Sequence, residues 1–138
     1  MNAALAYRWD GKPIDVYFEI ITGSYDQHLL VTFLKRLQSE FPKRRVILIW
    51  DGLPAHKTKV VKNYLTENRL MTVVQLPPYS PDLNPTEFLW GNLKGSELAN
   101  YVPDTLHDLA VRARTGINRI RKSSRLLGGF ARAAQMFF

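Results

Sequence analysis

Residues 46–57 read VILIWDGLPAHK, in which five apolar residues lead into an aspartate and a glycine. A short, continuous apolar run is typical of a strand that is covered on both faces, as in a parallel sheet. Asp51 then stands at the carboxyl end of that strand, the edge where open α/β sheets bind their ligands. This stretch therefore predicts an α/β fold with a functional edge at Asp51.

A hairpin is predicted on the amino-terminal side of this strand. Residues 4–9 and 14–21 are rich in aromatic and β-branched side chains, and Asp10-Gly11 between them is a favoured two-residue turn. We expect Trp9 and Trp50 to lie in the core, because large aromatic side chains are highly buried on average.

Helices and a further strand are predicted between this hairpin and the middle of the chain. Apolar residues recur at helical spacing from a cap at Ser24 or Asp26 to about Glu40. The same spacing returns over residues 57–68, and residues 71–76 form a further short strand.

The carboxy-terminal part is predicted to be helical. A Pro-rich loop leads into a helix that starts near Pro85. From Pro103 the pattern is helical to about Leu127, where Gly128-Gly129 breaks it. The alternation of strands and helices after a hairpin predicts a sheet of mixed direction that is flanked by helices.

The length and composition narrow the class of protein. A chain of 138 residues favours a single domain over residues 1–138, with a basic helical tail over about 103–138. The absence of cysteine excludes a disulfide scaffold, a thiolate zinc site and a cysteine nucleophile. No apolar run approaches the roughly 18 residues of a membrane span, and no leader opens the sequence. We therefore expect no membrane partner and a cytoplasmic protein, associated with the nucleoid when it binds DNA.

Positive charge gathers in the carboxy-terminal part. Residues 88–138 hold 8 basic and 3 acidic side chains, against 11 and 9 in residues 1–87, and the formal net charge is +7. Such an excess favours a polyanionic partner, most simply DNA, although a solvated helical face would look the same. The basic residues that we expect to contact DNA are Lys57, Lys59, Lys94, Arg112, Arg114, Arg119, Arg121 and Lys122.

Two acids are candidates for chemistry. Asp51 ends the apolar strand, and Glu87 follows 36 positions later in the first turn of the helix after the Pro-rich loop. A helix and a strand between them give enough chain to bring Glu87 back beside Asp51. Paired carboxylates are ligands that Mg²⁺ or Mn²⁺ prefers, and two such metals can drive phosphodiester cleavage.

Each of these residues also has a plain structural explanation. Asp51-Gly52 is a common turn after a strand. Asn84 fits the cap of the next helix, where Glu87 would reach back to the cap and complement the helix dipole. His56 could lie beside the metal site or contact phosphate, but a capping or partly exposed histidine explains it too.

Two long stretches make the pattern specific. Residues 46–57 resemble the second-aspartate block of bacterial insertion-sequence transposases of the mariner-like DDE superfamily. Residues 76–95, LPPYSPDLNPTEFLWGNLKG, resemble the third-acid block of that branch. The resemblance runs from the hairpin to at least Asn100. It implies a ribonuclease H-like fold and metal-dependent DNA strand cleavage and strand transfer at transposon ends.

The resemblance also assigns roles to residues. Asp51 matches the second catalytic acid and Glu87 the third, and both would bind Mg²⁺ or Mn²⁺. Apart from the resemblance, His56 and Asn84 are candidates to surround these two acids. The family's first catalytic aspartate lies on a central strand upstream of the hairpin, and no acid precedes Asp10 here. We therefore expect the sheet to lack its first, central strand, metal binding to be weak, and the chain to be inactive alone.

Three functions remain open on these grounds. The first is a transposase catalytic fragment that a complementing upstream segment completes. The second is a non-catalytic module that binds DNA or oligomerises, for example as a homodimer, and modulates the full transposase. The third is a nuclease or resolvase that takes its remaining acid from Asp15 or Glu19 on the hairpin.

Overall fold

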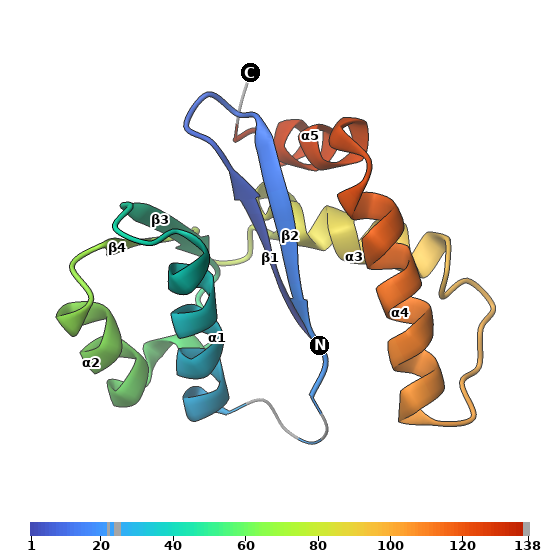
Figure 1. The fold of residues 1–138 in the computed structure, drawn as a ribbon, viewed down its shortest axis with the longest axis horizontal. Coiled ribbons are helices and arrows are strands. Elements are labelled where there is room, and N and C mark those ends of the chain that lie inside the picture. Colours follow the sequence, from blue (N-terminus) through green and yellow to red (C-terminus); the bar gives the residue numbers. More distant parts are fainter. Residues whose placement is uncertain (22, 24–25, 137–138) are drawn as a thin grey trace. The chain divides into compact units, whose positions relative to one another are not determined.

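The computed structural model describes residues 1–21, 23 and 26–136, and Figure 1 shows its ribbon. Contacts divide the chain into two compact units. The hairpin unit consists of Met1–Thr22 and Pro81–Phe138, and the parallel-strand unit of Gly23–Ser80. Within the described ranges, no helix combines the length and the apolar character that a membrane span requires.

The hairpin unit opens with two antiparallel strands, β1 (Asn2–Tyr7) and β2 (Pro13–Glu19). The predicted two-residue turn is wrong: residues 8–12 all lie between the strands. The amide of Arg8 donates to the carbonyl of Lys12 at 2.8 Å. Gly11 has a φ of 83°, a left-handed conformation that favours glycine, so the turn is wider than the dipeptide Asp10-Gly11 suggested.

Three helices pack on this hairpin and form its core. They are α3 (Pro85–Gly95), α4 (Leu106–Arg121) and α5 (Ser124–Ala133), and a 3₁₀ turn at Pro81–Leu83 precedes them. Helix α3 contacts β1, while α4 and α5 contact β2 (Figure 1). The buried core consists of Val16, Leu89, Leu93, Ile117, Ile120, Leu127 and Phe130.

The predicted end of the last helix at Gly128-Gly129 is wrong. Helix α4 ends at Arg121, and α5 begins after Ser123, whose hydroxyl accepts the amide of Leu126 at 3.2 Å. Both glycines lie inside α5. A serine cap starts the new helix, and burial of Leu127 and Phe130 offsets the roughly 1 kcal/mol that each internal glycine costs.

The parallel-strand unit carries the apolar run on strand β3 (Val46–Trp50), which pairs in parallel with β4 (Met71–Gln75). Helix α1 (Gln27–Glu40) precedes β3; a 3₁₀ turn (Pro54–Lys57) and helix α2 (Lys59–Glu67) lie between the strands. Helices α1 and α2 contact each other, and α2 contacts β4.

Helix α1 begins at one of the two predicted caps. The carboxylate of Asp26 accepts the amides of His28 and Leu29, both at 2.9 Å. The alternative cap, Ser24, lies outside the described residues.

Three sequence predictions about packing do not hold. The described strands form two separate two-stranded sheets rather than one mixed sheet. Ile47 is 69% exposed and Ile49 is also exposed, so β3 is not covered on both faces. Trp9, predicted in the core, is 89% exposed, whereas Trp50 is half-buried. An apolar run shows that residues prefer burial, but it does not show which face of a strand finds a neighbour.

Candidate functional site

Asp51 directly follows β3, at the carboxyl end of the parallel pair. One carboxylate oxygen, Oδ1, accepts the amide of Leu53 at 3.2 Å. The turn explanation for Asp51-Gly52 therefore holds. The side chain is nevertheless 40% exposed, so the carboxylate keeps lone pairs for a ligand.

His56 holds Asp51 from the following 3₁₀ turn. Its Nδ1 lies 2.8 Å from the Asp51 carbonyl oxygen and 3.2 Å from Asp51 Oδ1. Because a carbonyl oxygen only accepts, Nδ1 is the donor in this contact and carries a proton. The imidazole is 15% exposed and stacks on Trp50.

Gln75 is a neighbour of this turn that the sequence did not single out. It ends β4 and pairs in register with Trp50. A Cβ at Gly52 would lie 2.8 Å from Gln75 Nε2 and 3.4 Å from Lys57 Nζ. A polar residue at the end of the next parallel strand was the available signal, since such ends share one sheet edge. The amide and the ammonium group thus approach Gly52, beside Asp51.

Glu87 lies in the first turn of α3 and is exposed. The predicted cap is confirmed: Asn84 Oδ1 accepts the amide of Thr86 at 3.1 Å, and Pro85 is the first residue of the helix. The Glu87 amide donates to the Asn84 carbonyl at 3.0 Å. The carboxylate therefore stands at the positive end of a helix dipole and stays accessible to solvent.

Asp51 and Glu87 belong to different units, the parallel-strand unit and the hairpin unit. That the two carboxylates bind one metal ion stays a prediction, because each unit is described by itself. Among the described residues, no group of three or more His, Cys, Asp or Glu is arranged to hold a metal ion.

Two of the predicted DNA-binding arginines hold the chain segment that follows α3. Arg119 donates to both carboxylate oxygens of Glu97 and, at 2.6 Å, to Asn92 Oδ1. Arg112 Nε donates to the Glu97 carbonyl at 2.8 Å, and its guanidinium lies 4.7 Å from the centre of the Tyr101 ring. The hydrogen bond from Arg119 lowers the pKa of the Glu97 carboxyl below its usual value.

Arg121 also binds within the protein. Its Nε lies 2.7 Å from Asp15 Oδ1, and its Nη2 donates to the carbonyl of Val16. The Asp15 carboxylate accepts the Val16 amide as well, at 2.6 Å. Asp15 is thus engaged with β2 and α4.

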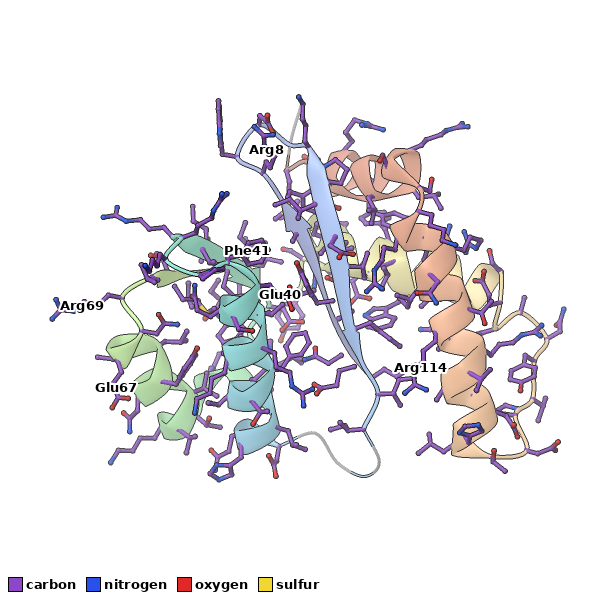
Figure 2. The ribbon with its side chains drawn as sticks, in the orientation of Figure 1. Arg8, Glu40, Phe41, Glu67, Arg69 and Arg114 are labelled. Atoms are coloured by element: carbon purple, nitrogen blue, oxygen red, sulfur yellow. The ribbon has the colours of Figure 1, made fainter. Side chains whose placement is uncertain are left out.

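The other predicted DNA-binding residues are exposed, and Figure 2 shows Arg114 on α4. Lys57 and Lys59 lie in the parallel-strand unit, at the 3₁₀ turn and the start of α2. The remaining ones lie in the hairpin unit: Lys94, Arg114 and Lys122.

Comparison with known proteins identifies the family of this chain. Residues 11–109 match the family model described as DDE superfamily endonuclease. An uncharacterized 39 kDa protein of the insertion element IS630 from Shigella sonnei is 31% identical over 93 residues. That match covers 67% of this chain and 27% of the relative, so the chain spans about a quarter of the relative's length.

Solved structures agree on the fold. The chain is similar to the Mos1 transposase catalytic domain determined with raltegravir and Mn, with a TM-score of 0.65 and 18% identity over 97% of this chain and 77% of that one. It is also similar to Mos1 transposase in a paired-end complex with the left transposon end, with a TM-score of 0.56 and 20% identity over 94% and 43% of the two chains. The expected α/β class is confirmed. By its match to the family model over most of its length, the chain belongs to the DDE superfamily of endonucleases.

Proposed function

We propose that this chain forms part of a transposase catalytic site that cleaves and transfers DNA strands, and that Asp51 and Glu87 are two of its metal-binding carboxylates. The observation that carries the proposal is the Asp51 carboxylate. It is accessible, lies at the carboxyl end of a parallel strand pair, and is held by a proton-donating His56 within a family of endonucleases.

The two carboxylates fit a hard divalent metal. Mg²⁺ and Mn²⁺ prefer oxygen ligands, and both side chains offer carboxylate oxygens to solvent. His56 directs its proton at Asp51, an arrangement that fixes a ligating carboxylate in other metal sites. A bound Mg²⁺ or Mn²⁺ would activate a water or hydroxyl at the phosphodiester and stabilise the leaving oxygen.

The chain's own residues would position the reactants around these acids. The Lys57 ammonium group and the Gln75 side-chain amide lie close to Gly52, next to Asp51, where both can donate to phosphate oxygens. In the other unit, the α3 amino terminus carries Glu87, and amides at such an end can bind phosphate. Binding and orientation of the DNA backbone are therefore the roles of these groups.

A third carboxylate is part of the proposal, supplied by a strand outside residues 1–138. One observation supports it: β3 has one paired neighbour, β4, in the described part of the chain. A strand added beside β3 would bring its side chains next to Asp51. It could come from a complementing segment or from a second polypeptide.

Two measurements test this proposal. Calorimetric titration with Mn²⁺ should show weak binding to the wild type that disappears when Asp51→Asn and Glu87→Gln are combined. Glu67→Gln and Asp104→Asn, two exposed acids on the same two units, should bind like the wild type. Unchanged binding in the double variant, or none in the wild type, would contradict convergence of the two acids.

The second measurement follows the nicking of supercoiled plasmid DNA with Mg²⁺. The chain alone should leave the plasmid intact. Nicking by the wild type that is lost in Asp51→Asn would show that residues 1–138 hold a sufficient set of ligands, and would remove the need for a third carboxylate.

The alternative function is DNA binding or oligomerisation without catalysis. The positive charge of residues 88–138 favours it independently of the acids. DNA affinity that depends on salt but not on metal, together with no metal binding, would support this alternative.

A further inference from the structure

Trp9 is a large exposed side chain that the proposed metal site leaves unexplained. It lies in the turn between β1 and β2 and is 89% exposed. Several large side chains of this hairpin pack inward: Tyr7 and Phe18 are half-buried and Val16 is completely buried, whereas Ile14 is 46% exposed. A single exposed tryptophan at a loop tip has no role in stabilising the hairpin unit.

The turn holds Trp9 in a defined position. The Arg8 amide donates to the Lys12 carbonyl at 2.8 Å, and the Gly11 amide donates to the Arg8 carbonyl at 2.9 Å. Asp10 Oδ1 accepts the Lys12 amide at 3.1 Å. Three hydrogen bonds therefore close the loop around Trp9, so its side chain is presented to solvent by an ordered backbone.

The strand that leads to the turn is anchored as well. The Tyr7 hydroxyl donates to the carbonyl of Leu127 in α5 at 2.7 Å. This bond is two residues from Trp9 and ties the end of β1 to a helix that also contacts β2. The hairpin near its tip is therefore tied to helix α5 of its unit.

Two cations flank the tryptophan. Arg8 precedes it at the turn (Figure 2), and Lys12 completes the loop, both with exposed side chains. The single acid, Asp10, is already engaged, with Oδ1 on the Lys12 amide and Oδ2 3.4 Å from Arg8 Nη2. The tip thus combines a flat aromatic surface with a net positive charge.

We propose that this hairpin tip is a DNA-binding element, in which Trp9 stacks on an unpaired or terminal base while Arg8 and Lys12 contact the neighbouring phosphates. The inference rests on the proposed role of the chain in DNA processing. Aromatic side chains within a positively charged surface bind single-stranded DNA in this way, because every base has a face on which to stack. The flanking cations favour DNA over a purely apolar protein partner.

The test compares two labelled DNA duplexes of the same length, one fully paired and one with a three-nucleotide single-stranded gap. Fluorescence anisotropy should show that the wild type prefers the gapped duplex by about tenfold, within the range that base stacking contributes. Trp9→Ala should remove the preference and leave binding to the paired duplex unchanged. Trp9→Phe should keep most of it, and Val102→Ala, another exposed apolar residue of the same unit, should behave like the wild type.

The outcomes separate this inference from the proposed function. A preference for gapped DNA that survives in Trp9→Ala overturns the role of the hairpin tip alone. Absence of DNA binding by the wild type overturns both proposals. Binding of the wild type, but not of Trp9→Ala, to anionic phospholipid vesicles, without an effect on gapped DNA, would assign the tip to a membrane and likewise overturn the inference. Because Trp9 is exposed, the variants should keep the wild-type melting temperature, which serves as the folding control.

Discussion

The imidazole of His56 stacks on the indole of Trp50, with ring centroids 4.1 Å apart and ring planes 6° apart. The stack places Nδ1 against both the carbonyl and the carboxylate of Asp51. One aromatic contact at the end of β3 thus fixes the histidine, and the histidine fixes the acid. The apolar residue before Asp51 therefore contributes to the candidate site as well as to the strand.

Loss of the His56 proton donor should weaken metal binding more than it weakens the fold. We expect His56→Phe to keep the stack on Trp50 and to lower Mn²⁺ affinity about tenfold, since residues that hold a ligand commonly contribute 10- to 100-fold. Calorimetry measures the affinity, and urea unfolding measures stability. His56→Ala should lower both. Wild-type metal affinity in His56→Phe would show that the hydrogen bond does not position Asp51.

Glycine is required at one position of α4 and replaceable at one position of α3. A Cβ at Gly116 would clash with the Leu93 side chain and lie 2.6 Å from Glu97 Oε2, whereas a Cβ at Gly91 meets nothing within 4 Å. We expect Gly116→Ala to lower the free energy of unfolding by about 1–3 kcal/mol. Gly91→Ala should raise it by about 0.5–1 kcal/mol through helix propensity. Equal effects in urea unfolding would contradict the close packing of α3 on α4.

The half-buried side chain of Tyr7 should make the free energy of unfolding fall at high pH. Burial raises the pKa of Tyr7 to about 12, from a usual value of 10.0. The unfolded chain therefore loses this proton first, and stability that is fully present below pH 10 is lost as the pH rises towards 12. Tyr7→Phe should remove this part of the pH dependence and cost about 1 kcal/mol at pH 7, where the bond to Leu127 is lost. Chemical unfolding at pH 7, 10 and 11 measures both effects.

Two arginines separated by one residue on α4 should have different roles. Arg112 is bound to Glu97 and lies over Tyr101, whereas Arg114 is exposed and is a predicted phosphate contact. Arg114→Ala should lower DNA affinity and reduce the slope of log K against log salt by about 1, with an unchanged melting temperature. Arg112→Ala should chiefly lower the melting temperature. Identical salt slopes in wild type and Arg114→Ala would remove Arg114 from the DNA surface.

The sequence predicted the helices and strands better than it predicted how they pack against one another. The apolar run at 46–50, the Asp26 cap and the Asn84 cap each depend on neighbouring residues, so local patterns reveal them. The exposure of Ile47 and Trp9 depends on which faces find a partner, which no local pattern records. The sequence also predicted a single mixed sheet. In the described residues β1 pairs with β2 and β3 with β4, and no local pattern records which strands pair.

In the candidate site, too, the sequence predicted residues better than it predicted their contacts. Asp51 and Glu87 stood out because one ends an apolar strand and the other begins the helix after the Pro-rich loop, and because both stretches resemble blocks of a transposase family. Gln75 was missed although it ends a predicted strand, because only the parallel pairing of that strand with β3 places its side chain at the edge where Asp51 lies. Arg112, Arg119 and Arg121 read as a DNA-binding run, yet each contacts a protein acid or carbonyl. A run of like charges does not show which residues far away in the sequence will bind it. Val16, for example, accepts a hydrogen bond from Arg121 across 105 residues of sequence.

The most direct test of the account is whether one metal ion senses both acids. NMR spectra of the isotope-labelled chain, titrated with Mn²⁺, report paramagnetic broadening residue by residue. We predict that the amide signals of Gly52 and Leu53 broaden at the same low Mn²⁺ concentration as those of Thr86 and Phe88, and that Asp51→Asn combined with Glu87→Gln abolishes both effects. Broadening around only one of the two acids, or equal broadening in the double variant, would contradict a shared metal site.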